Sequence, residues 1–162
     1  MIRNIVYNAI RTVVERLADA NDGRMVWSVD MFSRSEEWLD QVSRLTRPAV
    51  LVEIGELRWQ RTKEPGVYMS DGQVALHVVT DWNGEADNAR AFAVADAVTG
   101  AVDGMEGEGF GRVALQSSVT DRIGDLVESV ETFSIRVVRA TTRGTEVVPR
   151  GLQPRERQVR AR

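Results

Sequence analysis

The sequence has no cysteine and a single histidine, His77, among its 162 residues. Without cysteine the chain has no disulfide, no thiolate nucleophile and no cysteine-ligated metal site. One histidine excludes a metal site that needs several imidazoles from one chain. No apolar run approaches the roughly 20 residues that a membrane-spanning helix needs. From these absences we expect no catalytic residue set, no metal, no cofactor and no membrane contact.

Charge is unevenly spread along the chain. The formal net charge is −3, but residues 143–162 hold six arginines and two glutamates, which leaves −7 for residues 1–142. An acidic body disfavours general nucleic-acid binding, whereas a basic tail suits an acidic partner or DNA. The tail also lacks apolar periodicity. We expect one domain over residues 1–142 and a flexible arginine-rich tail over residues 143–162.

Two helices are predicted in the first third of the chain. Apolar residues recur every three to four positions over residues 2–18, which indicates an amphipathic helix that stops before a left-handed Gly23. A second helix is expected over residues 35–46, with Ser33 or Ser35 as its N-cap. Its inner stripe is predicted to be Trp38, Leu39, Val42 and Leu45.

An alanine-rich third helix is predicted over residues 85–102, with Asn83 as its cap. The glycine-rich loop at 103–111 follows it. Because this loop has no Lys-Ser/Thr pair and does not follow a strand, we interpret it as a connector rather than a phosphate cradle. The apolar bulk of the helix comes from Phe92, Val94, Val98 and Val102.

A long β-hairpin is predicted from residues 49–61 and 67–80, around a type II turn at 65–66 or an alternative turn at 71–72. A change in apolar alternation at 55–56 predicts a β-bulge. Thirteen extended residues span about 43 Å, at about 3.3 Å each, so the hairpin must bend or project. The second strand is expected to place Val74, Leu76 and Val78 on one face and Ala75, His77 and Val79 on the other.

A short strand or extended segment is expected within residues 25–32. A second hairpin is expected from strands at 112–119 and 126–140, joined by a turn at 120–125. The element order becomes helix, insertion, strand, strand, helix, strand, strand. This order predicts an α+β fold: an antiparallel sheet of about four strands with a long β-hairpin and helices packed on one face.

Few residues point to chemistry. His77 is a candidate general base, but no cysteine or serine-elbow motif accompanies it, so we favour a structural or interface histidine. Asp81, Glu85 and Asp87 do not match the spacing of a calcium loop. Carboxylates also occur at helix N-termini because the helix dipole favours them.

Basic and aromatic residues gather at the tip of the predicted hairpin. Such residues are enriched at protein interfaces and at nucleic-acid surfaces, although they also decorate ordinary surfaces. The candidate protein-interface residues are Arg58, Trp59, Arg61, Lys63 and Tyr68. The candidate tail contacts, with DNA or protein, are Arg150, Arg155, Arg157 and Arg160.

The order of segments over residues 1 to about 140 resembles the tail terminator (tail completion) proteins of long-tailed bacteriophages. The opening helix MIRNIVYNAIRTVVERL, the hairpin PAVLVEIGELRWQ…QVALHVVTD, the helix NARAFAVADAV and the ending TDRIGDLVESVETFSIRVV carry the resemblance. The family's F-x-I/V-x-V ending is matched by Phe133, Ile135 and Val137, and its acidic turn by Asp121 and Asp125. The long insertion near 20–46 and the arginine-rich tail depart from the family pattern.

The resemblance implies a non-enzymatic virion protein. Family members close into a ring, typically hexameric, on the last ring of the tail tube, where they stop tube growth and offer a surface to the head connector. The implied partners are further copies of the chain, the tail tube protein and a connector or neck protein, with DNA passing through the lumen without specific binding. The implied location is the head-proximal end of the virion tail, and the host cytoplasm during assembly.

Two alternatives remain open at the level of sequence. Neck or head–tail joining proteins look similar when only the order and pattern of segments are compared. A monomeric α+β domain that binds nucleic acid or a ligand through its basic tail also fits the charge distribution.

Overall fold

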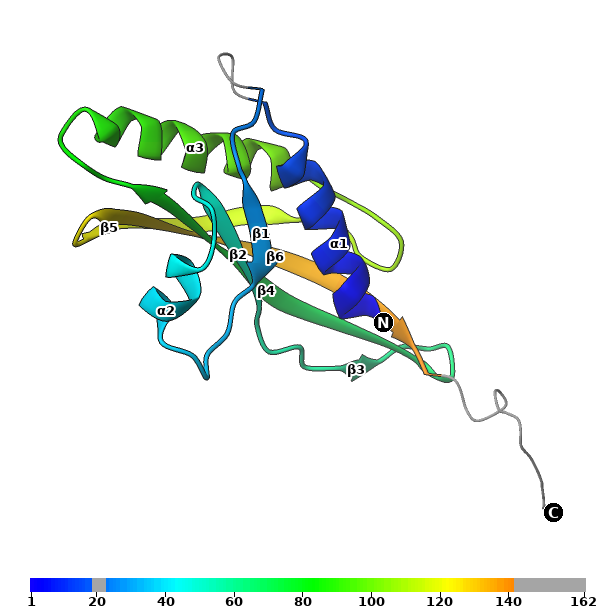
Figure 1. The fold of residues 1–162 in the computed structure, drawn as a ribbon. Coiled ribbons are helices and arrows are strands. Elements are labelled where there is room, and N and C mark those ends of the chain that lie inside the picture. The colour runs from blue at the N-terminus through cyan, green and yellow to red at the C-terminus, as the bar shows by residue number, and fades with distance from the viewer. Residues whose placement is uncertain (19–22, 142–162) are drawn as a thin grey trace.

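A six-stranded sheet forms the centre of the molecule (Figure 1), with strand order β1-β2-β4-β6-β5 and β3 paired to β4. The structure is a computed structural model that describes residues 1–18 and 23–141. Its elements are α1 (Ile2–Glu15), β1 (Ser28–Met31), α2 (Trp38–Ser43), β2 (Ala49–Ile54), β3 (Gln60–Arg61), β4 (Val67–Asp81), α3 (Asp87–Val102), β5 (Ala114–Ile123) and β6 (Leu126–Ala140). The predicted α+β class is confirmed.

One face of the sheet, called the α1/α3 face here, packs against α1 and α3 and holds most of the core (Figure 1). The apolar stripe of α1 is buried once per turn, as its spacing predicts. The central strands contribute alternate residues, because successive side chains of a strand point to opposite faces. These strand residues, all at most 3% exposed, are Val50, Val52, Val74, Leu76, Val78, Phe133, Ile135 and Val137.

The opposite face, called the α2 face, is covered only in part. Val42 of α2 packs on Leu51, Val79 and Leu126, which come from three different strands. The expectation that all helices lie on one face is therefore wrong. Strand alternation leaves apolar residues on both sides of β2 and β4, so the chain after β1 can pack the short α2 beneath the sheet.

The sheet is mixed rather than antiparallel. β1 pairs in parallel with β2, whereas the other strand pairs described are antiparallel. β4 and β6 run together over fifteen residues, from Val67 opposite Ala140 to Asp81 opposite Leu126. The first half of β4 is thus paired along one side with β6, and on its other side the described residues supply just the two-residue β3.

β2 ends at Ile54, although the Gly55 N–H still donates to Gln73 O at 2.8 Å. Pairing with β4 resumes at Gln60 opposite Met69, one residue out of register with Ile54 opposite Val74, so the chain after Gly55 contains the extra residue that the predicted bulge requires. Leu57 then lies so close to Gly72 that a Cβ on this glycine would sit 2.5 Å from a Leu57 methyl group. The type II turn at 65–66 fits the structure, because Gly66 has φ +78° and the Val67 N–H donates to Glu64 O at 3.1 Å. Residues 71–72 lie within β4 and form no turn.

Several predicted helix ends are also wrong. α1 ends at Glu15, and Gly23, although left-handed, lies beyond that end. The N-cap of α2 is Glu37, without a side-chain cap bond, so neither Ser33 nor Ser35 caps it. The hydroxyl of Ser33 instead lies 3.2 Å from that of Ser35, in a contact between the two side chains.

α3 likewise begins without the predicted cap. Its N-cap is Ala86, and the backbone N–H of Asn83 donates to the Asp87 carboxylate at 2.6 Å. Leu39, predicted on the inner stripe of the second helix, is 54% exposed instead, and Phe92, expected to add apolar bulk to the third helix, is 52% exposed. β5 continues to Ile123, so the turn predicted at 120–125 is shorter than expected and falls between Ile123 and Leu126. The polar residues 120–122 belong to the strand because the long β6 offers them backbone partners.

Candidate assembly surfaces

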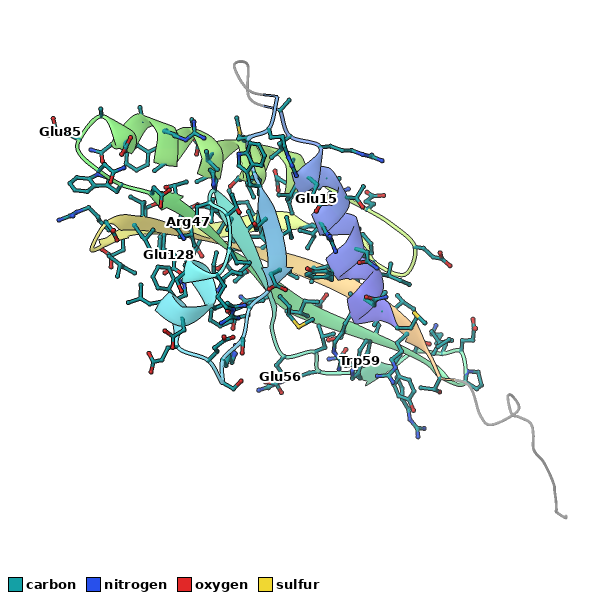
Figure 2. All side chains as sticks on the ribbon, viewed as in Figure 1. Glu15, Arg47, Glu56, Trp59, Glu85 and Glu128 are labelled. Atoms are coloured by element: carbon teal, nitrogen blue, oxygen red, sulfur yellow. The ribbon has the colours of Figure 1, made fainter. Side chains whose placement is uncertain are left out.

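The predicted interface residues are placed on the connection between β2 and β4 and on the start of β4. Arg58 is exposed and pairs with Glu56 at 3.1 Å. Trp59, labelled with Glu56 in Figure 2, is half-buried against the main core, and the guanidinium of Arg139 lies 5.6 Å from its ring centroid. Trp59 therefore anchors the connection, while Arg58 and its ion-pair partner Glu56 are exposed to solvent.

Arg61, Lys63 and Tyr68 come together at the end of the sheet. They line one hollow of about 550 Å³ beside the turn at 65–66, together with Thr141, the last described residue. The structure thus joins three of the five predicted interface residues at the point from which the tail leaves. The tail candidates, Arg150, Arg155, Arg157 and Arg160, lie outside the described residues.

The edge strand β5 is exposed on both of its faces. All eight residues from Leu115 to Arg122 are exposed, including Leu115 at 41% and Val119 at 63%. Phe92 of α3 and Arg122 of β5 line a hollow of about 220 Å³ alongside this edge. Long exposed edge strands are templates for pairing with another chain. Sequence reasoning missed this edge because its polar end was interpreted as a turn.

The opposite edge of the sheet carries an apolar groove of about 430 Å³. β1 ends at Met31, opposite Val52, so β2 runs on for two residues without a strand beside it in the described part of the chain. Met31 at this edge is 59% exposed. The groove is lined by Met1, Arg3, Asn4, Tyr7, Met31, Phe32, Arg34, Val52, Glu53 and Ile54.

His77 lies on the α2 face, between two carboxylates from neighbouring strands. Its Nδ1 is 3.0 Å from Glu128 Oε2 and its Nε2 is 2.9 Å from Glu53 Oε1. Phe32 stacks on the imidazole, with ring centroids 4.2 Å apart and planes 7° from parallel. Glu53 also pairs with Arg34. Both ring nitrogens are thus engaged within the protein, which matches a structural role rather than that of a general base.

The two carboxylates favour the charged form of His77. A neutral imidazole donates through one nitrogen only, so just the imidazolium satisfies Glu53 and Glu128 together. Burial lowers the pKa of His77, but the hydrogen bonds and charges of Glu128 and Glu53 raise it by more, and the net pKa lies above its ordinary value. His77 therefore ties β2, β4 and β6 together through charged hydrogen bonds.

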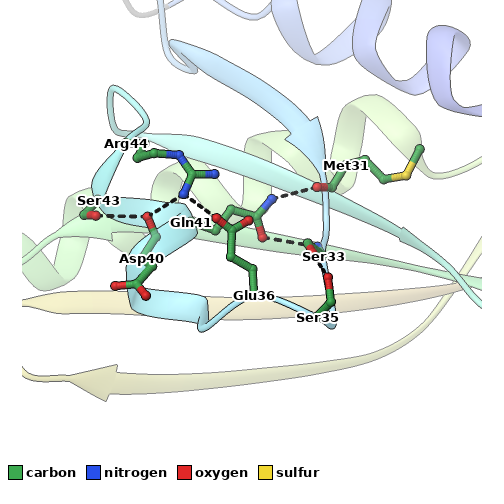
Figure 3. Close-up of polar contacts among 8 residues, drawn as sticks. All are labelled: Met31, Ser33, Ser35, Glu36, Asp40, Gln41, Ser43 and Arg44. Atoms are coloured by element: carbon green, nitrogen blue, oxygen red, sulfur yellow. Dashed lines mark hydrogen bonds and ion pairs between the residues drawn. The ribbon is translucent and has the colours of Figure 1, made fainter.

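Gln41 fastens α2 to the chain that follows β1 (Figure 3). Its Nε2 donates to Met31 O at 2.7 Å, and its Oε1 accepts from the Ser33 N–H at 3.2 Å. The side chain is 3% exposed. Sequence reasoning missed Gln41, although a polar residue beside Val42 on the inner side of a short helix was a usable signal.

Two of the three acidic candidates, Asp81 and Asp87, form ordinary structural contacts, and Glu85 is exposed. Asp81 pairs with Arg47 at 2.6 Å, and Asp87 accepts the Asn83 N–H described above. Within the described ranges, no three histidine, aspartate or glutamate side chains gather as ligands for a metal ion. The same part of the chain has no helix of the length and apolarity that crossing a membrane requires.

Comparison with known proteins adds a structural likeness. No family model matches the chain, and no curated protein matches its sequence. One solved chain, from the virion of a native gene transfer agent (GTA) particle, is similar with a TM-score of 0.53 and 17% identity. The match covers 83% of this chain and 95% of that chain. The two chains share a fold.

Proposed function

We propose that this chain is a structural protein of a phage-like virion, and that it acts as a tail terminator. In this role copies of the chain close into a ring, hexameric in our proposal, on the last ring of the tail tube. The ring ends tube growth and presents a docking surface to the head–tail connector. The DNA passes through its lumen without specific binding, since an acidic lining repels phosphates.

The observation that carries this proposal is the fold shared with a chain of the GTA virion, which the match covers almost entirely. The order of segments supports it independently, through the resemblance to tail terminators. The exposed edge strand β5 also suits a protein that works by assembly, because such an edge invites a partner. The titratable cluster at His77 is occupied with internal hydrogen bonds, which suits a structural rather than a catalytic protein.

Native mass spectrometry and electron microscopy test the proposal. The expected result is a ring of identical subunits, alone or on mixing with tail tube protein, found at one end of assembled tubes. Rings that bind a portal or connector but ignore tube ends would favour a neck protein, which the same fold match also supports. A lasting monomer that binds DNA with steep salt dependence would favour the nucleic-acid-binding alternative.

The tail needs a test of its own. A chain that ends at residue 142 lacks all six tail arginines. If the tail is the contact with DNA or a connector, the truncated chain keeps its fold and its ring but loses that affinity. Unchanged affinity would show that the tail arginines are not the contact.

A further inference from the structure

We propose that β5 of one copy pairs with the β1 edge of the next copy, so that the sheets join edge to edge around a closed ring. The inference rests on the proposed ring function and names the two surfaces that make the contact. It commits to a second copy of this chain as the partner of both sheet edges. Three features of the described residues carry it: exposure, shape and strand direction.

Exposure distinguishes β5 from its neighbour. Along β6, buried and partly buried residues alternate almost to the end, whereas β5 exposes eight consecutive residues on both faces. A bulge between Leu115 and Ser117 interrupts the pairing of β5 with β6, and the charged residues of the strand, Asp121 and Arg122, lie near its end, whereas the middle of the strand is uncharged and has no proline. A ten-residue edge of this kind is usually covered in the functional assembly.

The two edges of the sheet complement each other in shape. β5 presents an exposed apolar side chain, Leu115, on the α1/α3 face, because its partner on β6 is Phe133. Beyond the bulge, Val119 lies opposite Val130 and points to the α2 face. The β1 edge offers the apolar groove beside Met31, together with the outer backbone of β2 past the end of β1. Because knob and groove lie on opposite edges of one sheet, the contact is heterologous, and a rotation that closes gives a ring rather than a dimer.

Strand direction permits the pairing. β1 runs parallel to β2, and each following neighbour in the order β2, β4, β6, β5 reverses direction. β5 is therefore antiparallel to β1. A rotation about an axis that follows the strands preserves these directions, so β5 meets β1 of the next copy as an antiparallel pair, the commoner kind of strand pairing.

Cysteine cross-linking tests this contact cleanly, because the natural chain has no cysteine. We would introduce Leu115→Cys and Met31→Cys together, in the full chain, because both side chains lie on the α1/α3 face, and treat the protein with a short bis-maleimide. The expected product is a ladder of covalent multimers up to the ring size. The matched control pairs Leu115→Cys with Leu39→Cys on α2, where the side chain is exposed to a similar extent as Met31 but lies on neither edge, and it should give no ladder.

A second variant gives an independent readout. Val119→Lys should abolish the ring in native mass spectrometry while the melting temperature of the subunit stays unchanged, and Leu39→Lys should leave the ring intact. Cross-linked dimers from Leu115→Cys alone would show that two β5 strands pair with each other, which overturns the proposal. Rings that form without a Leu115–Met31 cross-link would also overturn it but leave the ring function standing, whereas a chain that stays monomeric and ignores tail tubes defeats both.

Discussion

The two faces of the sheet are built in different ways. The α1/α3 face is apolar over most of its area and is closed by two helices, with Val50, Leu76 and Phe133 fully buried at its centre. The α2 face has a small apolar cluster under one short helix, and beside it a charged group of His77, Glu53 and Glu128. One face is held by packing, and the other is held by directed hydrogen bonds.

Because of this difference, we expect one face to contribute mainly to overall stability and the other mainly to local order. Burial of apolar area is the main favourable term in folding, so we expect the α1/α3 face to supply most of the free energy of unfolding. Hydrogen bonds to charged groups contribute less each but fix geometry. The α2 face therefore holds the segment from Met31 to Ser43, and with it the groove at the β1 edge, in one arrangement.

The largest expected effect comes from truncating matched leucines on the two faces. Leu76 and Leu51 are both fully buried and lie on neighbouring strands, but they point to opposite faces. We expect Leu76→Ala to lower the free energy of unfolding by about 2–5 kcal/mol, toward the upper end because a closed core cannot collapse into the cavity. Leu51→Ala should cost less, since the small cluster under α2 can relax.

Urea unfolding of both variants at one pH measures this difference, with Leu39→Ala as an exposed control. Equal losses for Leu76→Ala and Leu51→Ala would mean that the two faces contribute alike to stability. A larger loss for Leu51→Ala would reverse the comparison.

The next effect is the pH dependence that His77 brings to the α2 face. The pKa of His77 is raised in the folded chain, although burial alone would lower it, because Glu128 and Glu53 accept its hydrogen bonds. Its contribution is complete below the unfolded histidine pKa of about 6.5 and is lost as pH rises through the higher folded pKa. At pH 6, His77→Gln should cost about 1.5–3 kcal/mol, the range for a hydrogen bond to a charged group.

Two measurements check this prediction. Because His77 is the single histidine, its imidazole proton gives one NMR titration curve, which should show a midpoint above 6.5, the ordinary value. The unfolding free energies of the natural chain and of His77→Gln should converge as pH rises from 6 to 9. A constant gap over that range, or a midpoint below the ordinary value, would contradict a charged clamp.

A smaller effect is expected at Gln41, which joins α2 to the chain after β1 (Figure 3). Gln41→Ala leaves Met31 O and the Ser33 N–H without their side-chain partner, so we expect a loss of about 1–3 kcal/mol. Hydrogen exchange of the Ser33 amide should accelerate. Asp40→Ala, an exposed change in the same helix, should alter neither quantity; if both variants behave alike, Gln41 does not fasten the segment.

The sequence predicted the α1/α3 face better than the α2 face, for a physical reason. The alternation Val74, Leu76, Val78 and the stripe on α1 are local periodicities, and the structure confirms both. The charged group at His77 depends on the register of three strands, and His77 and Glu128 are 51 positions apart in the sequence. No local pattern encodes such a register. The parallel pairing of β1 with β2 is a long-range contact of the same kind.

The edges of the sheet were harder to predict from the sequence than either face. Thr120, Asp121 and Arg122 have the composition of a turn, yet they continue β5 because β6 beside them is long enough to pair with them. The predicted interface residues divide between a core anchor, Trp59, the partly buried Tyr68 and three exposed cations. Composition alone cannot make that division, since an aromatic ring at a hairpin tip suits packing and recognition equally.

The smallest effect on stability is expected at the exposed cations. The same variants should show most clearly whether assembly can be weakened while the fold is unchanged. Arg58→Glu with Arg61→Glu reverses two charges that are solvent-exposed, so the free energy of unfolding should change by less than about 0.5 kcal/mol. If this end of the sheet contacts a ring neighbour or the tail tube, particle formation should weaken all the same. Arg11→Glu on the exposed side of α1 is the matched control, because it too reverses a cation that pairs with a nearby glutamate. Unaltered particle formation by the double variant would remove the β3–β4 end from the assembly surface and leave the two sheet edges as the contacts that remain to be tested.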